Sequence, residues 1–320
     1  MTPERSRRDL ARLSHGTDSP LRVLVTGASG LIGATLVPFL ESGGHEVCRL
    51  VRRSAAAPAE ISWDPAAGKI DASALEGFDA VVHLAGENIG AGRWTEARRG
   101  RIWQSRVQAT ELLCGALAGL SQPPSVLVAA SAVGYYGDTA DQVDESAPVG
   151  KGFLAELTDA WEHAAAPARD AGIRVAHARL GAVLSPQGGL LKRLLPLFRM
   201  GAGGVVGSGY QPMSWIGMDD AIGALYFLMC SEEALGPINV VAPKPTTNRE
   251  FTRTLAAVLR RPAFARVPSF AISALYGEMG EQLILKGQAA VPARLDALGF
   301  RWEEPALEGA LRWELGKPSN

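Results

Sequence analysis

The sequence has few cysteines, no excess of either charge and no long hydrophobic run. Its three cysteines, Cys48, Cys114 and Cys230, lie in apolar stretches without C-x-x-C spacing or nearby histidine pairs. This scarcity excludes a disulfide framework and a zinc site, and it favours a reducing compartment, so we expect a cytoplasmic protein. No stretch reaches the roughly 18 apolar residues of a membrane-spanning helix.

Positive and negative charges balance almost completely along the chain. Lysine and arginine number 32, aspartate and glutamate number 33, and the formal net charge is −1 at pH 7. No overall field draws such a chain toward nucleic acid or an anionic membrane, and we expect neither as a partner. The expected partner is a small-molecule substrate. The sequence leaves open whether the protein forms a homodimer.

What the sequence does contain is a regular alternation of short apolar runs and helical patterns. Strands are predicted at 21–25, 46–51, 80–84, 125–129 and 173–178, and helices at 31–41, 101–120 and 153–169. Runs this short and apolar are typical of buried parallel strands. Their order predicts an α/β fold of the Rossmann type, a doubly wound parallel sheet with right-handed crossovers.

The chain divides near residue 180, where the alternation gives way to glycine- and proline-rich segments. We expect the Rossmann domain over 21–180 and a smaller C-terminal substrate lobe over 181–316, with part of 218–242 packing back on the Rossmann domain. Residues 1–20 carry four arginines, three acidic residues and little to bury, which predicts a flexible tail.

The first predicted strand runs into a glycine-rich turn, Gly27-Ala28-Ser29-Gly30-Leu31-Ile32-Gly33, which precedes a helix. This spacing allows a tight turn, brings backbone N–H groups against a pyrophosphate and directs the positive end of a helix dipole at it. The sequence therefore predicts a dinucleotide site. The alternative is a structural turn in another α/β fold.

Two arginines, Arg52 and Arg53, follow the second predicted strand, where an acidic residue would bind the ribose 2′-hydroxyl of NAD. Guanidinium groups match a 2′-phosphate instead, so the sequence favours NADP(H) over NAD(H) as the cofactor. The alternative is that both arginines are simply solvated at the end of a strand.

Several motifs beyond the turn resemble those of one known family. They include Val82-His83-Leu84-Ala85-Gly86-Glu87-Asn88, Ser105-Arg106-Val107, Ser131-Ala132-Val133-Gly134-Tyr135-Tyr136-Gly137 and Ser214-Trp215-Ile216. From 22 to about 314 the chain resembles the extended short-chain dehydrogenases/reductases, in an atypical branch of the epimerase/dehydratase group. The resemblance implies that Leu84, Ala85 and Gly86 run beside the adenosine and pyrophosphate, and that Ser131 faces the substrate.

Three polar positions of that family are changed in this chain. The resemblance places Phe153 and Leu157 where the family has an acid/base tyrosine and a lysine, and Arg106 where it has an asparagine. Neither Phe153 nor Leu157 can transfer a proton. Hydride transfer assisted by the usual tyrosine and lysine is therefore not expected.

A substitute acid is predicted near Ser131. Our hypothesis is that Tyr135 or Tyr136 supplies the proton, because a guanidinium such as that of Arg106 lowers the pKa of a nearby phenol. The alternative is that both tyrosines pack in a loop and that Arg106 forms a structural ion pair with Glu87 or another carboxylate.

Four further residues are candidates for substrate contact. Glu87 and Asn88 follow the end of a strand, where ligands of open α/β sheets gather, or else they cap the structure there. Gln211 and Trp215 lie at the predicted lobe boundary, in a segment that we expect to cover the substrate cleft. The adjacent acidic residues 219–220 predict a helix cap, and no metal site is expected because the five histidines lack ligand spacing.

Two functions follow from these patterns. The first is an NADP(H)-dependent oxidoreductase or epimerase acting on a small carbonyl or hydroxyl compound, without the usual tyrosine and lysine. The second is a non-catalytic sensor or scaffold that binds NADP(H), which the loss of those two residues would permit.

Overall fold

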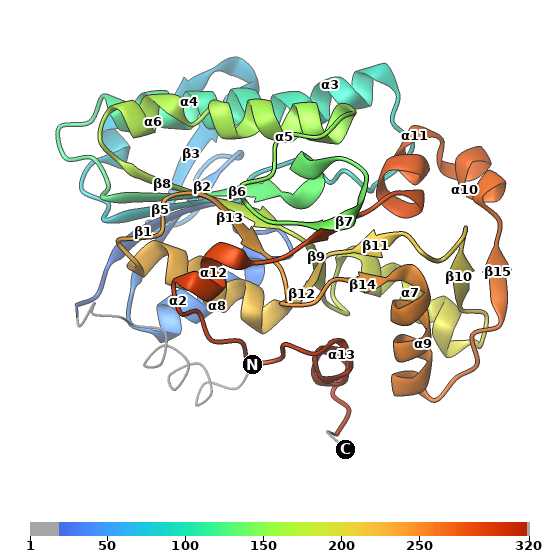
Figure 1. Cartoon of the computed structure of the whole chain (residues 1–320). Helices are drawn as coiled ribbons and strands as arrows, with labels where there is room; N and C mark the ends of the chain where they lie inside the picture. The colour runs from blue at the N-terminus through green and yellow to red at the C-terminus, as the bar shows by residue number, and fades with distance from the viewer. Residues whose placement is uncertain (1–18, 319–320) are drawn as a thin grey trace.

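The computed structural model describes residues 19–318, so the tail predicted over 1–20 lies almost entirely outside the described residues. Its centre is a sheet of eight strands, in which all neighbours are parallel except the last pair (Figure 1). From edge to edge the order is β13 (Gly236–Val240), β8 (Arg174–Leu180), β6 (Val126–Ala132), β5 (Ala80–His83), β1 (Arg22–Thr26), β2 (Glu46–Val51), β3 (Glu60–Asp64) and β4 (Lys69–Ile70).

The strand order reverses at β1, because β2 lies on one side of it and β5 on the other. In open parallel sheets such a reversal leaves a crevice at the carboxyl ends of the two neighbouring strands, and ligands bind there. The predicted Rossmann-type, doubly wound α/β fold is confirmed.

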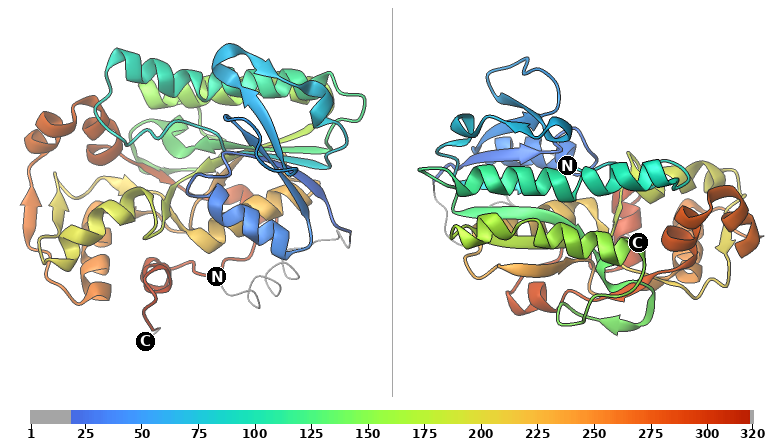
Figure 2. Two further views of the ribbon diagram at one scale, coloured as in Figure 1. Left: turned by 180° about the vertical axis from the view of Figure 1, so that it is seen from behind. Right: turned by 90° about the horizontal axis from the view of Figure 1, so that it is seen from above.

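Helices cover both faces of the sheet (Figure 1 and Figure 2). One face carries α3 (Glu96–Gln104), α4 (Val107–Ala118), α5 (Phe153–His163) and α6 (Ala166–Asp170). The other face carries α2 (Gly33–Ser42), α8 (Met218–Cys230) and α12 (Ala293–Ala297). Both α8 and β13 belong to the second half of the chain: α8 joins the helical layer of α2, and β13 forms one edge of the sheet.

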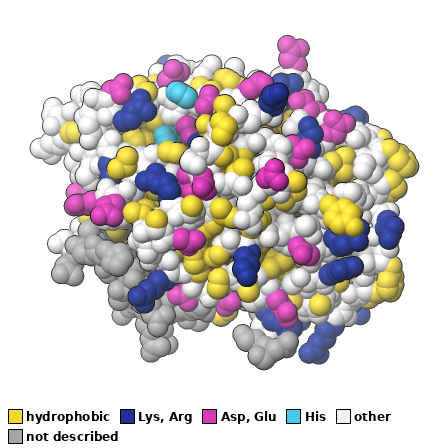
Figure 3. Space-filling view, in the orientation of Figure 1, with side chains coloured by type: hydrophobic (Ala, Val, Ile, Leu, Met, Phe, Trp, Pro, Cys, Tyr) yellow, Lys and Arg dark blue, Asp and Glu magenta, His cyan; other side chains and the backbone are white. Residues whose placement is uncertain are grey.

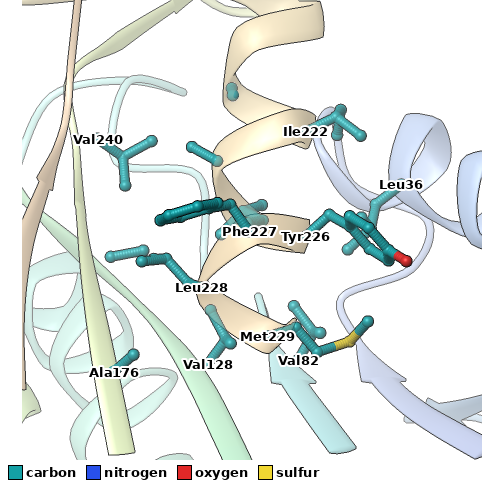
Figure 4. Packing of buried hydrophobic residues seen from close by; sticks show 14 of the residues in the cluster. Leu36, Val82, Val128, Ala176, Ile222, Tyr226, Phe227, Leu228, Met229 and Val240 are labelled. Carbon is teal, nitrogen blue, oxygen red and sulfur yellow. The ribbon is translucent and has the colours of Figure 1, made fainter. Parts of the chain in front are cut away.

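The core beneath α8 shows how this layer is held together (Figure 4). Tyr226, Phe227 and Leu228 are at most 3% exposed, and their cluster includes Leu36 of α2 and Val82 of β5. Burying large apolar side chains stabilises each by about 1.5 to 3 kcal/mol. Packing of α8 against α2 and the strands therefore fixes the position of the β1–α2 turn.

The helix predicted at 101–120 is divided in two. It ends at Gln104, and a new helix begins at Val107 after an interruption at Ser105 and Arg106. The apolar spacing continues across the interruption, which is why periodicity alone did not reveal it. Likewise, the helix predicted at 153–169 ends at His163 and is followed by the short α6.

Outside the central sheet the chain forms short strand pairs and further helices, most of them in the C-terminal lobe. The pairs are β9 (Ala182–Leu184) with β12 (Trp215–Gly217), β10 (Gly204–Val206) with β15 (Ala265–Val267), β11 (Pro212–Met213) with β14 (Thr246–Thr247), and β7 (Thr139–Val143) with β16 (Gln288–Ala290). The helices are α7 (Gly189–Arg199), α9 (Asn248–Leu259), α10 (Ser269–Tyr276), α11 (Glu278–Gly280) and α13 (Leu307–Glu314).

Short helical turns complete the chain: η1 (Pro65–Ala67), η2 (Ala72–Leu75), η3 (Val133–Tyr136) and the π-helical η4 (Glu281–Leu285). Between residues 19 and 318, no helix has the length and apolar character needed to cross a membrane. Cys48 and Cys114 are buried free thiols, and Cys230 is partly buried.

Candidate dinucleotide site

The turn between β1 and α2 requires glycine at two of its positions because backbone segments meet there. Gly27 has a φ of 67°, and a Cβ on it would lie 2.6 Å from the carbonyl carbon of Leu84. A Cβ on Gly33 would overlap the carbonyl oxygen of Gly27 and lie 2.7 Å from the Cα of Ala28. Glycine therefore brings β1, α2 and the end of β5 into direct backbone contact.

The N-terminus of α2 suits an anionic ligand. Ile32 provides no side-chain cap, and the first turn of the helix contains no acidic residue. The first N–H groups of a helix lack partners within it, and the helix dipole adds positive charge at the same end. The residues present thus fit a pyrophosphate held by backbone amides at positions 31–33.

A buried chain of polar side chains fixes the β5 side of this turn. Oγ1 of Thr26 accepts hydrogen bonds from the backbone N–H groups of Leu84 and Ala85, at 3.1 Å each. It therefore donates its own proton to Nδ1 of His83, 2.7 Å away. This leaves the His83 proton on Nε2, which contacts Oγ1 of Thr110 at 2.9 Å. The sequence analysis did not predict these hydrogen bonds. The available signal was that Thr26, His83 and Thr110 are polar residues within apolar strands and an apolar helix face.

The burial of His83 gives the protein's stability a pH dependence. Burial lowers the pKa of His83 to about 4, below that of an exposed histidine. The unfolded chain binds a proton below about pH 6.5, whereas the folded chain does so only below about pH 4. We therefore expect the free energy of unfolding to fall by up to about 3 kcal/mol over that interval because of this group.

The measurement is urea denaturation at several pH values, for the wild type and for His83→Gln. The variant should show a shallower fall of stability between about pH 6.5 and pH 4. His45 and His177, whose pKa values burial also lowers, keep part of the slope in both proteins. Equal slopes would show that His83 is not the neutral, buried group described above.

The two arginines after β2 are in different situations. Arg53 donates two hydrogen bonds to Glu60, at 2.8 and 2.6 Å, and these hold the pKa of Glu60 at about 2. Arg52 is exposed beside it. The carboxylate holds Arg53, whereas Arg52 forms no ion pair within the described residues.

Arg106 lies at the break between α3 and α4, against the end of β5. A Cβ on Gly86 would lie 3.2 Å from Cζ of Arg106, and the guanidinium stacks 5.2 Å from the ring centre of Trp161. Its nearest acceptors, the carbonyl of Ile102 and the Ser105 hydroxyl, are 3.4 and 3.5 Å from Nη1. Burial lowers the pKa of Arg106 to about 10.

Glu87 pairs with other arginines, Arg98 at 3.3 Å and Arg101 at 3.9 Å. The alternative ion pair between Arg106 and Glu87 is therefore not formed. Arg106 is a guanidinium with weak hydrogen bonds at the strand ends.

Ser131 does not face the crevice. It is 2% exposed, and its hydroxyl donates a 2.5 Å hydrogen bond to Oε1 of Glu162 on α5. Arg179 on β8 binds the same carboxylate through Nε and Nη2, both at 2.8 Å. The expectation of a substrate-facing Ser131 is thus corrected: its side chain belongs to a buried ion-pair network beneath α5.

The same network includes Tyr136. Its hydroxyl accepts a 3.0 Å hydrogen bond from Arg179 and donates one of 2.7 Å to Oδ1 of Asn239. Burial raises the pKa of Tyr136, and the nearby Arg179 only partly offsets this. The hypothesis of a phenol with a lowered pKa is therefore wrong for Tyr136. Tyr135 is partly exposed, with its ring centre 3.5 Å from the Arg179 guanidinium carbon.

The guanidinium beside the tyrosines is that of Arg179, and not that of Arg106 as the sequence suggested. Arg179 is a single charge in an otherwise apolar strand, as Arg106 is in its helical pattern. That signal could have identified it. Its partner Glu162 lies on α5, where charged residues are common on the outer face, so the sequence does not distinguish it from a solvent-exposed glutamate.

Phe153 and Leu157 are core residues of α5, at 7% and 2% exposure. The ring of Phe153 makes an edge contact with the ring of Trp94, and its centre lies 4.4 Å from the guanidinium carbon of Arg99. Both positions where the family has its tyrosine and lysine are thus occupied by packed apolar side chains.

The predicted substrate residues lie in different surroundings. Asn88 is exposed, and its side chain accepts a 2.9 Å bond from the N–H of Gly90. Gln211 donates to the carbonyls of Val206 and Ile284, at 3.0 and 3.1 Å. Trp215 is 1% exposed in the core of the C-terminal lobe, so its predicted contact with substrate is wrong.

The acidic residues at the start of α8 serve as helix-terminal and tertiary acceptors. Asp220 accepts bonds from the N–H groups of Glu303 and Glu304, and Asp219 accepts one from Trp313. No group of three or more metal-ligating side chains occurs within the described part of the chain.

The sheet order, the glycine turn and the uncapped helix define a Rossmann-type protein of the short-chain dehydrogenase/reductase kind. The chain belongs to the NAD dependent epimerase/dehydratase family, whose model matches residues 23–242. A second model, a domain of unknown function (DUF1731), matches residues 267–314.

The similarity to known relatives extends over nearly the whole chain. An epimerase family protein of Mycobacterium bovis is 42% identical and covers 92% of this chain and 98% of its own. Epimerase family protein SDR39U1 of Homo sapiens is 38% identical, with coverage of 91% and 99%. The Arabidopsis thaliana homologue, 37% identical over 96% of this chain and 90% of its own, is named chloroplastic, so the predicted cytoplasmic location does not hold throughout the family.

Solved structures agree with this assignment. The crystal structure of human SDR39U1 with NADPH has a TM-score of 0.84 at 36% identity and covers 92% of this chain and 99% of its own. MoeE5 in complex with UDP-glucose and NAD has a TM-score of 0.72 at 24% identity, with coverage of 92% and 99%, and shares the fold. The chain is therefore an epimerase-family protein of the SDR39U1 type.

Proposed function

We propose that this protein binds NADP(H) across the carboxyl ends of β1, β5 and β6 and acts as an oxidoreductase or epimerase on a small carbonyl or hydroxyl compound. The observation that carries the proposal is the backbone contact of Gly27 and Gly33 at the uncapped start of α2. The NADPH in the crystal structure of human SDR39U1, 36% identical, supports the choice of cofactor.

Each part of the cofactor has a counterpart in the chain. The amides at 31–33 would hold the diphosphate, Arg52 the 2′-phosphate, and the backbone of 84–86 would lie alongside. When bound, the nicotinamide supplies hydride chemistry. The chain's own contribution is to orient the ring and to stabilise charge that develops on the substrate oxygen.

Cofactor preference is tested by Arg52→Gln. A charge-assisted hydrogen bond to a phosphate contributes about 1.5 to 3 kcal/mol, so the dissociation constant of NADPH should rise by at least about tenfold. That of NADH should not change, since it lacks the 2′-phosphate. Fluorescence titration with both nucleotides gives the two constants.

The matched control is Arg49→Gln, which removes a half-exposed arginine of β2 that pairs with Glu41. It should leave both dissociation constants unchanged. Tighter binding of NADH than of NADPH by the wild type, or an equal loss of both in Arg52→Gln, would contradict the proposed preference.

Catalysis would depend on groups other than the usual ones. Since Ser131 and Tyr136 belong to the buried network, the candidates from the sequence that remain at the strand ends are Arg106 and Tyr135. Within residues 19–318 the guanidinium of Arg106 has no carboxylate partner, and a partly buried cation of this kind is suited to stabilising negative charge on a substrate oxygen. We assign that role to Arg106 and leave proton transfer to Tyr135.

A second function, an NADP(H) sensor or scaffold without turnover, is favoured by one observation. The hydroxyls of Ser131 and Tyr136 donate to buried protein acceptors, and Phe153 and Leu157 carry no titratable group. Screening aldehydes, ketones and alcohols for NADPH oxidation or NADP+ reduction separates the two functions. Turnover that falls in Arg106→Gln supports the enzyme, whereas tight NADPH binding without turnover on any class supports the sensor.

A further inference from the structure

The outer edge of the C-terminal lobe combines exposed phenylalanines with arginines in one short segment. Within residues 260–270, Phe264 is 82% exposed and Phe270 is 76% exposed. Arg260, Arg261 and Arg266 of the same segment are exposed as well, and the segment has no acidic residue. Exposed apolar side chains that gather into one patch, rather than standing singly, often mark an interaction surface.

A second segment extends this surface. Met200, at the end of α7, is 72% exposed, and a Cβ on the following Gly201 would lie 3.4 Å from the ring of Pro262. Strand β10, which follows, pairs in parallel with β15. We call this surface the outer patch; it consists of Leu197, Arg199, Met200, Arg260, Arg261, Phe264, Arg266 and Phe270.

The patch lies in a strongly basic part of a chain whose net charge is close to zero. Residues 181–218 and 241–277 contain one acidic side chain, Glu250, which is engaged in capping α9. The same ranges contain nine basic residues: Lys192, Arg193, Arg199, Lys244, Arg249, Arg253, Arg260, Arg261 and Arg266. Figure 3 shows hydrophobic and basic side chains interspersed along the edge where β10, β15 and α10 lie in Figure 1.

We propose that the outer patch docks this protein on an anionic membrane surface. Phenylalanines on an exposed loop and at the start of an exposed helix can enter the boundary between headgroups and acyl chains, and the arginines around them can meet lipid phosphates. Each basic residue near an anionic bilayer contributes attraction of its own. The balanced net charge, from which no membrane partner was expected, conceals this uneven distribution.

A second copy of the chain is a poorer occupant of the same surface. In a two-fold symmetric dimer the patch would meet itself, which would bring the arginines of both copies together. An anionic bilayer instead complements both the charge and the apolar side chains. The proposal stands independently of the cofactor site, because no residue of the outer patch belongs to that site.

The test is co-sedimentation of the full chain with vesicles of phosphatidylcholine alone, and of phosphatidylcholine with phosphatidylglycerol at about 7:3. Binding is expected only to the anionic vesicles, and it should weaken as salt is added. Replacing both Arg260 and Arg261 by glutamine should weaken it by about fivefold for each arginine. Replacing Phe264 and Phe270 by alanine should weaken it by at least about tenfold.

Two matched variants outside the patch serve as controls. Arg301→Gln removes another exposed arginine, and Leu235→Ala removes a leucine that is 56% exposed. Both should bind the vesicles as the wild type does, and far-ultraviolet circular dichroism should show that all variants remain folded.

Three outcomes would overturn the proposal. They are no binding to anionic vesicles at low salt, equal binding to neutral and anionic vesicles, and binding that survives the loss of Arg260 and Arg261. If vesicles are not bound and sedimentation velocity shows self-association that Phe264→Ala abolishes, the patch belongs to a contact between copies of this chain instead.

Discussion

Replacing Gly33 by alanine should abolish measurable NADPH binding, although the change adds a single methyl group. The new Cβ would overlap the carbonyl oxygen of Gly27 and approach the Cα of Ala28, both of which are backbone atoms that no side-chain movement can relieve. The turn must therefore open, which moves the amides at the start of α2 away from the diphosphate. Overpacking of this kind also destabilises the fold by about 1 to 3 kcal/mol.

Isothermal titration with NADPH measures the loss of binding, and urea denaturation measures the loss of stability. The control is Gly115→Ala in α4, where an added Cβ would meet nothing within 4 Å. That change should leave NADPH binding intact and stabilise the helix by about 0.5 to 1 kcal/mol. A Gly33→Ala variant that binds NADPH as tightly as the wild type would contradict the role assigned to this turn.

Removing the charge of Arg179 should have the largest effect on stability. Arg179→Met leaves Glu162 buried without its counter-charge, because the two side chains are only 3% and 11% exposed. Breaking a buried ion pair in this way costs about 3 to 5 kcal/mol. The free energy of unfolding, measured in urea at neutral pH, should fall by that amount.

Comparison with two further variants assigns the loss to the unpaired carboxylate. Removing both charges, with Glu162→Leu and Arg179→Met together, should restore part of the stability. Arg169→Met, which breaks a pair between exposed side chains, should change it by less than about 0.5 kcal/mol. If Arg179→Met costs no more than Arg169→Met, the network beneath α5 does not hold the strand ends together.

The parts of the fold that the sequence revealed are those that local patterns determine. The strand at 46–51 and the glycine turn follow from apolar runs and backbone requirements that act within a few residues. The break at Arg106 was missed because both helices present their apolar residues in the same register.

Side-chain direction and long-range pairing could not be predicted in the same way. Ser131 lies next to the last residue of β6, and only its hydrogen bond to Glu162 shows that its hydroxyl lies beneath α5. Trp215 follows a glycine-rich segment that suggested a flexible cover, yet it fills the core of the C-terminal lobe. In each case tertiary packing of distant segments decides where the side chain points.

A crystal structure of this protein grown with NADPH would show whether the cofactor binds at the β1–α2 turn. We expect the diphosphate oxygens to lie within hydrogen-bonding distance of the amides at 31–33, at the start of α2, and the 2′-phosphate to contact Arg52. Electron density for the nucleotide elsewhere on the molecule, or none at this turn at millimolar NADPH, would contradict this expectation.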